Sequence, residues 1–138
     1  MRLFDASVLV AAFSRERASA QALALLAGEP SPLVNALGLA ETRIALIRKR
    51  KRGEMTPDEV RRALAELDLS INDGSLTVLP QSEAMWTEAV AIADRVAVHL
   101  RTQDALHAAC ATLAGVALAT FDDDLAAAAR AEGIDVTP

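Results

Sequence analysis

The sequence is poor in the residues that build disulfide or zinc scaffolds. Its 138 residues include one cysteine, Cys110, and two histidines, His99 and His107. A lone cysteine excludes an intrachain disulfide framework and a cysteine-based zinc site. Two histidines would leave a zinc ion dependent on carboxylates, which suit harder cations better. Cys110 is therefore expected to be a small core residue.

Aromatic residues and long apolar runs are also scarce. The chain has no tyrosine, three phenylalanines and one tryptophan, so it lacks the aromatic platform on which single-stranded nucleic acids stack their bases. No apolar run approaches the roughly 20 residues that cross a bilayer, and Asp5 stands where a signal peptide would have its hydrophobic core. We therefore expect a cytoplasmic protein without a membrane partner, folded as a single domain over residues 1–138.

Basic residues are outnumbered overall but strongly clustered. The formal net charge is −5, which disfavours a polyanionic partner. Eight of the 14 basic residues, against three acidic ones, lie between Arg43 and Arg62, so this window carries +5 and the remainder −10. Two interpretations stay open, a solvated helix end and turn or a local strip that contacts nucleic-acid phosphates. The run at its centre is Arg48, Lys49, Arg50, Lys51 and Arg52.

Short apolar runs alternate with helical patterns along the whole chain. The expected strands are residues 3–4, 33–34, 76–80, 116–120 and 134–136, with helices between them. Because these strands are too short and apolar to be half-exposed hairpins, they indicate right-handed βαβ crossovers. The predicted fold class is α/β, a three-layer α/β/α sandwich around a central parallel sheet of about five short strands.

Capping residues mark where several helices begin. Ser7 is expected to cap the first helix and Thr102 a later one, while Thr56 opens a capping box. Helical spacing places further apolar residues on inward-facing stripes. Three of these residues are Ile44, Trp86 and Leu113.

Four acidic residues fall where the predicted fold would gather them. Ligands of open parallel sheets bind beyond the carboxyl ends of the strands; Asp5 ends the first strand and Asp122 follows the fourth. Asp104 lies in the first turn of a helix, and Glu41 lies beside an apolar helical stripe. Each acid alone could be a cap, a helix-dipole partner or half of a surface ion pair. Together, without interleaved lysines, they would repel one another unless bound by a hard cation such as Mg²⁺ or Mn²⁺.

Several short motifs resemble those of PIN-domain nucleases. Residues 5–10 (DASVLV) resemble the N-terminal D-T/S-S-x-L signature, and residues 39–41 (LAE) resemble the helix-borne glutamate. Residues 100–109 (LRTQDALHAA) are similar to the L-x-x-x-D-A-L-H-L-A segment of bacterial VapC-type toxins. Residues 118–122 (LATFD) resemble an L-x-T-x-D segment, and the resemblance extends over residues 3–136.

The resemblance implies an enzyme with a defined cofactor and defined partners. Such proteins are Mg²⁺- or Mn²⁺-dependent endoribonucleases, toxins of type II toxin–antitoxin pairs that a cognate antitoxin inhibits. It also implies a homodimer and an RNA substrate, which would give the basic run Arg48–Arg52 a phosphate-binding role. The expected catalytic metal ligands are Asp5, Glu41, Asp104 and Asp122.

Some positions around these ligands carry expectations of their own. The hydroxyls of Ser7 and Thr120 are suited to holding a carboxylate or a phosphate oxygen, although Ser7 could simply cap a helix and Thr120 could simply favour a strand. His107 is expected to be structural, because a metal ion that lowers the pKa of water makes a general base unnecessary.

The sequence departs from the family pattern at two places. The run Asp122-Asp123-Asp124 leaves either Asp122 or Asp124 as the fourth acid, and the threonine two residues earlier favours Asp122. The segment Val34-Asn35-Ala36 stands where the family usually has small hydroxyl residues.

Two other classes of protein share part of this pattern. A haloacid-dehalogenase-like phosphatase also has an aspartate after its first strand, but it needs a second one two residues later, where this chain has Ser7. A non-catalytic RNA-binding or protein-interaction module with a PIN-like fold would explain the basic run or the apolar helices, but it would not explain the four placed acids.

Overall fold

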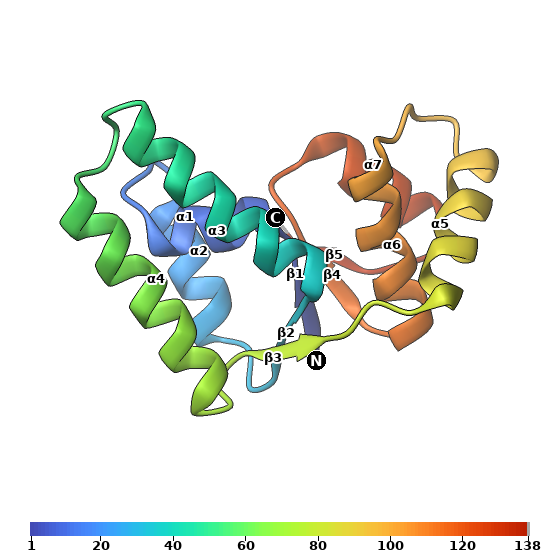
Figure 1. The fold of residues 1–138 in the computed structure, drawn as a ribbon. Helices are drawn as coiled ribbons and strands as arrows, with labels where there is room; N and C mark the ends of the chain where they lie inside the picture. The colour runs from blue at the N-terminus through green and yellow to red at the C-terminus, as the bar shows by residue number, and fades with distance from the viewer. Residues whose placement is uncertain (138) are drawn as a thin grey trace.

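A parallel sheet of five short strands runs through the computed structural model, which describes residues 1–137 (Figure 1). The strands are β1 (Arg2–Phe4), β2 (Pro32–Asn35), β3 (Thr77–Leu79), β4 (Ala117–Ala119) and β5 (Val136–Thr137). Their order in the sheet is β3-β2-β1-β4-β5, and all neighbouring pairs are parallel. The chain builds outward from β1 on one side and then crosses to the other, so β1 and β4 flank the topological switch point. The predicted α/β sheet is confirmed.

Seven helices connect and cover these strands within residues 1–137. They are α1 (Ala6–Phe13), α2 (Ser19–Ala27), α3 (Ala36–Lys51), α4 (Pro57–Asn72), α5 (Glu83–Arg95), α6 (Thr102–Ala114) and α7 (Asp123–Ala131). In Figure 1, α1 to α4 lie on one side of the sheet and α5 to α7 on the other. No helix among the described residues is long and apolar enough to cross a membrane.

Alternation along the strands divides the hydrophobic core in two. Leu3 and Leu118 pack with α5, α6 and α7, whereas the next residues, Phe4 and Ala119, pack with α1, α2 and α4. All four side chains are fully buried. Successive side chains of a strand point to opposite faces, so burial on both faces makes the strands apolar throughout and gives the three layers.

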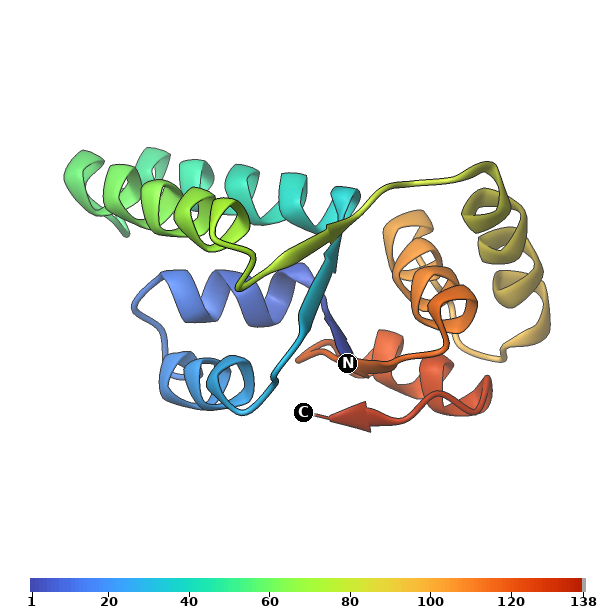
Figure 2. The same cartoon turned by 90° about the horizontal axis from the view of Figure 1, so that it is seen from below.

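Helices α3 and α4 form a hairpin that extends beyond the sheet (Figure 2). A small separate core joins them, with Leu46 of α3 against Val60 of α4. Thr56 caps α4 in the expected capping box. Because the basic run 48–52 ends α3, its last residues lie at the tip of this hairpin.

Five local predictions were wrong. Asp5, not Ser7, caps α1 through its side chain, and α6 begins after Arg101 without a side-chain cap rather than at a Thr102 cap. Three residues predicted to face inward are about half exposed, namely Ile44 at 47%, Trp86 at 49% and Leu113 at 51%. Helical spacing predicts which residues share a stripe, but the width of the stripe that neighbouring elements cover depends on tertiary packing.

Candidate active site

Asp5 lies at the switch point, between the ends of β1 and β4. Its backbone N–H donates to the carbonyl of Ala119, and its carboxylate caps α1 by accepting from the N–H of Val8 at 3.2 Å. The side chain is buried. Burial raises the pKa of the Asp5 carboxyl, against the opposing effect of its hydrogen bonds from Ser7 and Thr120.

Two hydroxyls hold this carboxylate and connect it to the chain after β4. Ser7 Oγ donates to Asp5 Oδ1 at 2.5 Å and accepts from the N–H of Phe121. Thr120 Oγ1 donates to Asp5 Oδ2 at 2.6 Å and accepts from the N–H of Asp122. The two hydroxyls therefore orient Asp5 and anchor the turn that carries Asp122.

Glu41 is held by a buried histidine. Oε2 of Glu41 on α3 lies 2.7 Å from Nε2 of His107 on α6, and Nδ1 of His107 lies 3.1 Å from Nδ2 of Asn35. Oδ1 of Asn35 accepts from the N–H of Gly38, so its amide nitrogen must face the ring. An amide NH₂ only donates, and this assigns Nδ1 as the acceptor and the proton to Nε2, which donates to Glu41.

The packing around His107 is tight because α3 approaches α6 closely at Gly38. A Cβ atom at Gly38 would lie 3.1 Å from Cε1 of His107 and 3.1 Å from Oδ1 of Asn35. Gly38 is buried in the first turn of α3, and Asn35 caps that helix. The absence of a side chain at this position lets the Asn35–His107–Glu41 chain of hydrogen bonds form.

Asp104 and Asp122 are joined by an arginine. Nε and Nη2 of Arg101 donate to the two oxygens of Asp104 at 2.8 and 3.3 Å, and Nη2 also donates to Oδ2 of Asp122 at 3.0 Å. Oδ1 of Asp122 caps α7. Asp104 is buried, whereas the Arg101 side chain is 60% exposed. The hydrogen bonds that Arg101 donates to Asp104 and the negative charge of Asp104, followed by the charges of Asp122 and Glu41, raise the pKa of the Arg101 guanidinium.

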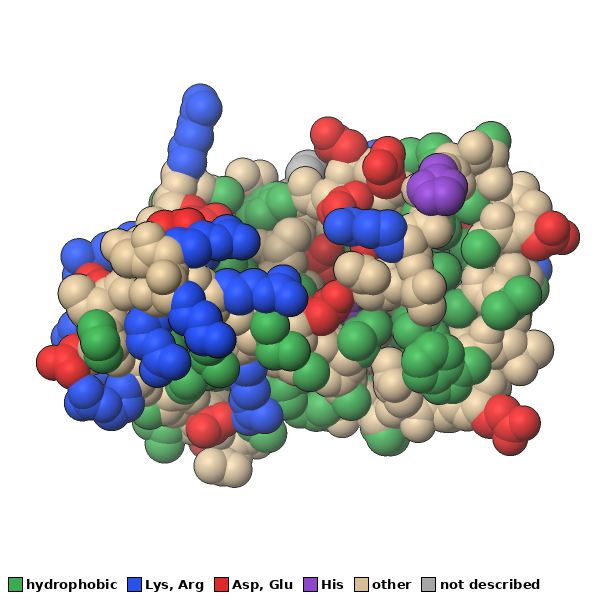
Figure 3. All heavy atoms as spheres, turned by 45° about the horizontal axis from the view of Figure 1, so that its top comes forward, with side chains coloured by type: hydrophobic (Ala, Val, Ile, Leu, Met, Phe, Trp, Pro, Cys, Tyr) green, Lys and Arg blue, Asp and Glu red, His purple; other side chains and the backbone are tan. Residues whose placement is uncertain are grey.

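A single hollow of about 560 Å³ brings the four predicted acids together. Ser7, Arg48, Arg101 and His107 line it as well. In the space-filling view, acidic side chains gather in the middle of one face, beside the basic side chains over α3 and α4 (Figure 3). Asp122, the N-cap residue of α7, lines the hollow, whereas Asp124 in the first turn of α7 does not.

The expectation that only a bound cation could balance these acids was wrong. Arg101 lies between Asp104 and Asp122 and supplies a positive charge from within the chain. Within residues 1–137, no three Asp, Glu, His or Cys side chains already stand together as a metal cage. The donor set is nevertheless the oxygen-only kind that suits Mg²⁺ or Mn²⁺, which are commonly held by one or two carboxylates and several waters.

The basic run divides between the hollow and the tip of the α3–α4 hairpin. Arg48 lines the hollow, whereas Lys49 is mostly buried and forms ion pairs with Glu16 at 2.6 Å and Glu54 at 3.3 Å. Arg52 lies 3.7 Å from Glu54. Among the described residues, Arg50 and Lys51 have no ion-pair partner. Arg48 is therefore the member of the run placed beside the acids.

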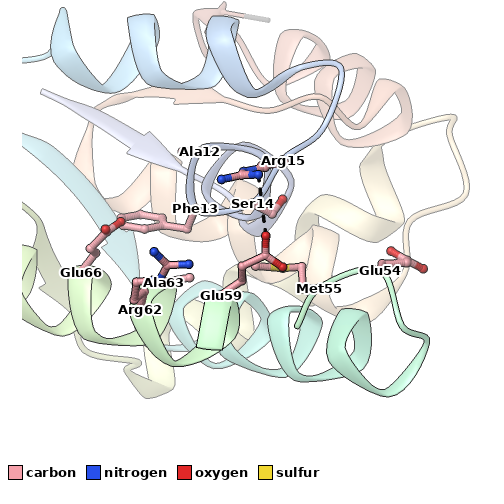
Figure 4. A pocket seen from close by; sticks show the side chains of 10 residues that line it. All are labelled: Ala12, Phe13, Ser14, Arg15, Glu54, Met55, Glu59, Arg62, Ala63 and Glu66. Carbon is pink, nitrogen blue, oxygen red and sulfur yellow. Dashed lines mark ion pairs between the residues drawn. The ribbon is translucent and has the colours of Figure 1, made fainter. Parts of the chain in front are cut away.

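A second hollow, of about 270 Å³, lies between the end of α1 and the α3–α4 hairpin (Figure 4). Phe13 and Met55 provide apolar lining, and Arg15 and Glu59 form an ion pair across it at 3.8 Å. Its charged residues include both signs. None of the four predicted acids lines it, so the candidate site is the larger hollow.

The sequence did not predict the contacts of three further residues that hold the acids, Arg101, His107 and Asn35. Arg101 stands three positions before Asp104, a helical spacing that indicates an ion pair. His107 stands three positions after Asp104 on the same face of α6, and Asn35 is the polar residue noted as a departure from the family pattern. The contacts of His107 span 66 and 72 positions, so only the fold reveals them.

The sheet order and the acid-lined hollow define an α/β protein whose candidate site lies at the switch point of its sheet. The family model of the PIN domain matches residues 2–131, so the chain belongs to the PIN domain family. The sequence resemblance is confirmed. No curated protein matches the chain by sequence.

Several solved structures share this fold. The toxin VapC20 of Mycobacterium tuberculosis, described as cleaving the sarcin–ricin loop, is 20% identical with a TM-score of 0.72, over 93% of this chain and 95% of that one. FitAcB of Neisseria gonorrhoeae is 18% identical with a TM-score of 0.75, over 100% and 97%. VapBC2 of Rickettsia felis, bound to a promoter DNA fragment, is 15% identical with a TM-score of 0.67, over 99% and 96%. At these identities the likeness establishes the fold.

Proposed function

We propose that residues 1–138 form one nuclease domain, a divalent-metal-dependent endoribonuclease that acts in the cytoplasm as the toxin of a toxin–antitoxin pair. One observation carries the proposal. Carboxylates from four segments far apart in the sequence, Asp5, Glu41, Asp104 and Asp122, line one hollow at the switch point of the sheet. Placing four acids together costs stability, and a cation-dependent reaction explains why they are there.

The proposed cofactor is Mg²⁺ or Mn²⁺, held by these four carboxylates directly or through water. When bound, such an ion would stabilise the negative charge that develops in phosphodiester hydrolysis and lower the pKa of water. Ser7 and Thr120 fix the carboxylate of Asp5, and His107 fixes that of Glu41. Arg48 would position the RNA backbone at the rim, because phosphate contacts orient a nucleic acid without specifying its sequence.

The proposed partners follow from the family and from the surface. VapC20 is described as a toxin that cleaves the sarcin–ricin loop, and another similar structure is a toxin–antitoxin complex from Klebsiella pneumoniae, 24% identical with a TM-score of 0.63. These likenesses support a cognate antitoxin. For the proposed homodimer, α5 offers exposed Trp86 and Val90 one helical turn apart.

RNA cleavage with and without a divalent cation tests this function. The purified protein should cleave a structured RNA in Mn²⁺ or Mg²⁺ and should not cleave it in EDTA, because the acids alone supply no positive charge at the reacting phosphate. Restoring Mn²⁺ after chelation should restore cleavage, which separates loss of the cation from loss of the protein. Equal cleavage in EDTA and in Mn²⁺ would refute metal dependence.

A non-catalytic RNA-binding or protein-interaction module is the alternative function. It is favoured by the Arg101 guanidinium between Asp104 and Asp122 and by the lack of a preformed metal cage within residues 1–137. That alternative predicts RNA or protein binding with no cleavage under any cation condition.

A further inference from the structure

Within residues 1–137, Arg101 is the one positive side chain that bonds two of the four acids. Both oxygens of Asp104 and one oxygen of Asp122 accept from its guanidinium. Arg48 and His107 also line the hollow, but His107 bonds only Glu41 among the acids, and Arg48 has no ion-pair partner among the described residues. One positive charge from within the chain therefore already offsets part of the negative charge of Asp104 and Asp122.

A divalent cation bound to these oxygens would stand beside the guanidinium, and two positive charges so close together repel each other. An arginine does not lose its proton in proteins, so it must move if another cation takes its place. The side chain is 60% exposed, which leaves it room to leave while its backbone stays fixed at the start of α6. Movement toward solvent would also carry the guanidinium to the rim of the hollow.

Resting on the proposed nuclease function, we propose that Arg101 is a resident cation that competes with the divalent metal for Asp104 and Asp122. In the metal-free protein Arg101 offsets the repulsion between the two carboxylates and holds them in place. Metal binding displaces Arg101. The arginine therefore weakens the affinity of the site for the metal and keeps the site free of metal at low metal concentration.

The test compares Mn²⁺ binding to the wild type, Arg101→Gln and Arg95→Gln by isothermal titration calorimetry. Arg95 is a matched control, because it also bonds two carboxylates, those of Glu88 and Glu132, but it does not line the hollow. Arg101→Gln should bind Mn²⁺ about fivefold more tightly, in keeping with the loss of exposed ion pairs. Arg95→Gln should bind as the wild type does.

A second readout follows Arg101 directly. In the wild type, the Nε–Hε NMR signal of Arg101, assigned by its absence in Arg101→Gln, should shift or broaden when Mg²⁺ is added. Unchanged or weaker Mn²⁺ affinity in Arg101→Gln would overturn the competition while leaving the metal site intact. If neither the wild type nor Arg101→Gln binds Mn²⁺, the result would instead contradict the metal site and the proposed function together.

Discussion

Replacing Asp5 by asparagine should abolish metal-dependent RNA cleavage. The change keeps the size of the side chain but removes a full negative charge from the centre of the acid-lined hollow. Activity should fall by more than about a hundredfold, because the loss of residues that merely orient metal ligands already costs about 10- to 100-fold. The measurement is the initial rate of cleavage of a defined RNA in saturating Mn²⁺.

Asp123→Asn is the matched control for this experiment. Asp123 is exposed, lies directly beside Asp122 and does not line the hollow, so its variant should cleave at the wild-type rate. Parallel purification of the wild type, Asp5→Asn and Asp123→Asn also controls for contaminating ribonuclease. Wild-type activity in Asp5→Asn would remove Asp5 from the catalytic assignment.

The melting temperature of Asp5→Asn in EDTA, measured over a range of pH, tests the effect of burial on the Asp5 carboxyl. Burial raises the pKa of Asp5 above its usual value of 3.8, so the folded protein holds this proton more tightly than the unfolded chain. Ionisation of the buried carboxyl therefore lowers the free energy of unfolding of the wild type at a pH above the folded-state pKa. At a pH below the unfolded-state pKa both states are protonated, and this loss is absent. The melting temperature of Asp5→Asn minus that of the wild type should therefore increase as the pH is raised from about 4 to 7, because only the wild type carries the ionised Asp5. A difference that does not change with pH would contradict the raised pKa.

Gly38→Ala should destabilise the protein although glycine is a poor helix former. In an open helix this change gains about 1 kcal/mol. Here the new methyl group would press on His107 and Asn35, which are both buried and hydrogen-bonded. Overpacking costs about 1–3 kcal/mol, so chemical denaturation should show a net loss of unfolding free energy. Cleavage should fall as well, because His107 holds Glu41.

A double-mutant cycle with His107→Ala tests the cause of that loss. Removing the imidazole should cancel most of the penalty of Gly38→Ala, since residues in direct contact couple by about 0.5–3 kcal/mol. Additive effects, or a Gly38→Ala protein more stable than the wild type, would show that α3 and α6 are not tightly packed at this point.

The fold could be predicted from the sequence because its signals are local. Apolar runs such as that ending at Phe4 mark buried strands, and the capping box at Thr56 marks the start of α4. Trp86 could not be placed from the sequence. Its position fits the apolar stripe of α5, but nothing covers that part of the helix among the described residues, and this depends on how α5 packs on α6.

The grouping of the four acids could be predicted from the sequence, and the hydroxyls of Ser7 and Thr120 could be expected to hold a carboxylate, but which residues bond to which acid could not. Parallel strands end at the same edge, and this argument was enough to expect Asp5 and Asp122 together. The bond of Arg101 to Asp122 spans 21 positions, and the bond of Thr120 to Asp5 spans 115. Such contacts depend on the strand order, which places β4 beside β1. The hydrophobic periodicity of the sequence does not predict them.

Anomalous X-ray diffraction from a crystal grown with Mn²⁺ would locate the metal directly. We expect anomalous difference density in the hollow lined by Asp5, Glu41, Asp104 and Asp122, with the Arg101 side chain moved away from Asp104. The same crystals in EDTA should lack that density and keep Arg101 on Asp104. Full Mn²⁺ occupancy elsewhere on the molecule, with the hollow empty and Arg101 still between Asp104 and Asp122, would contradict both the metal site in the hollow and the displacement of Arg101.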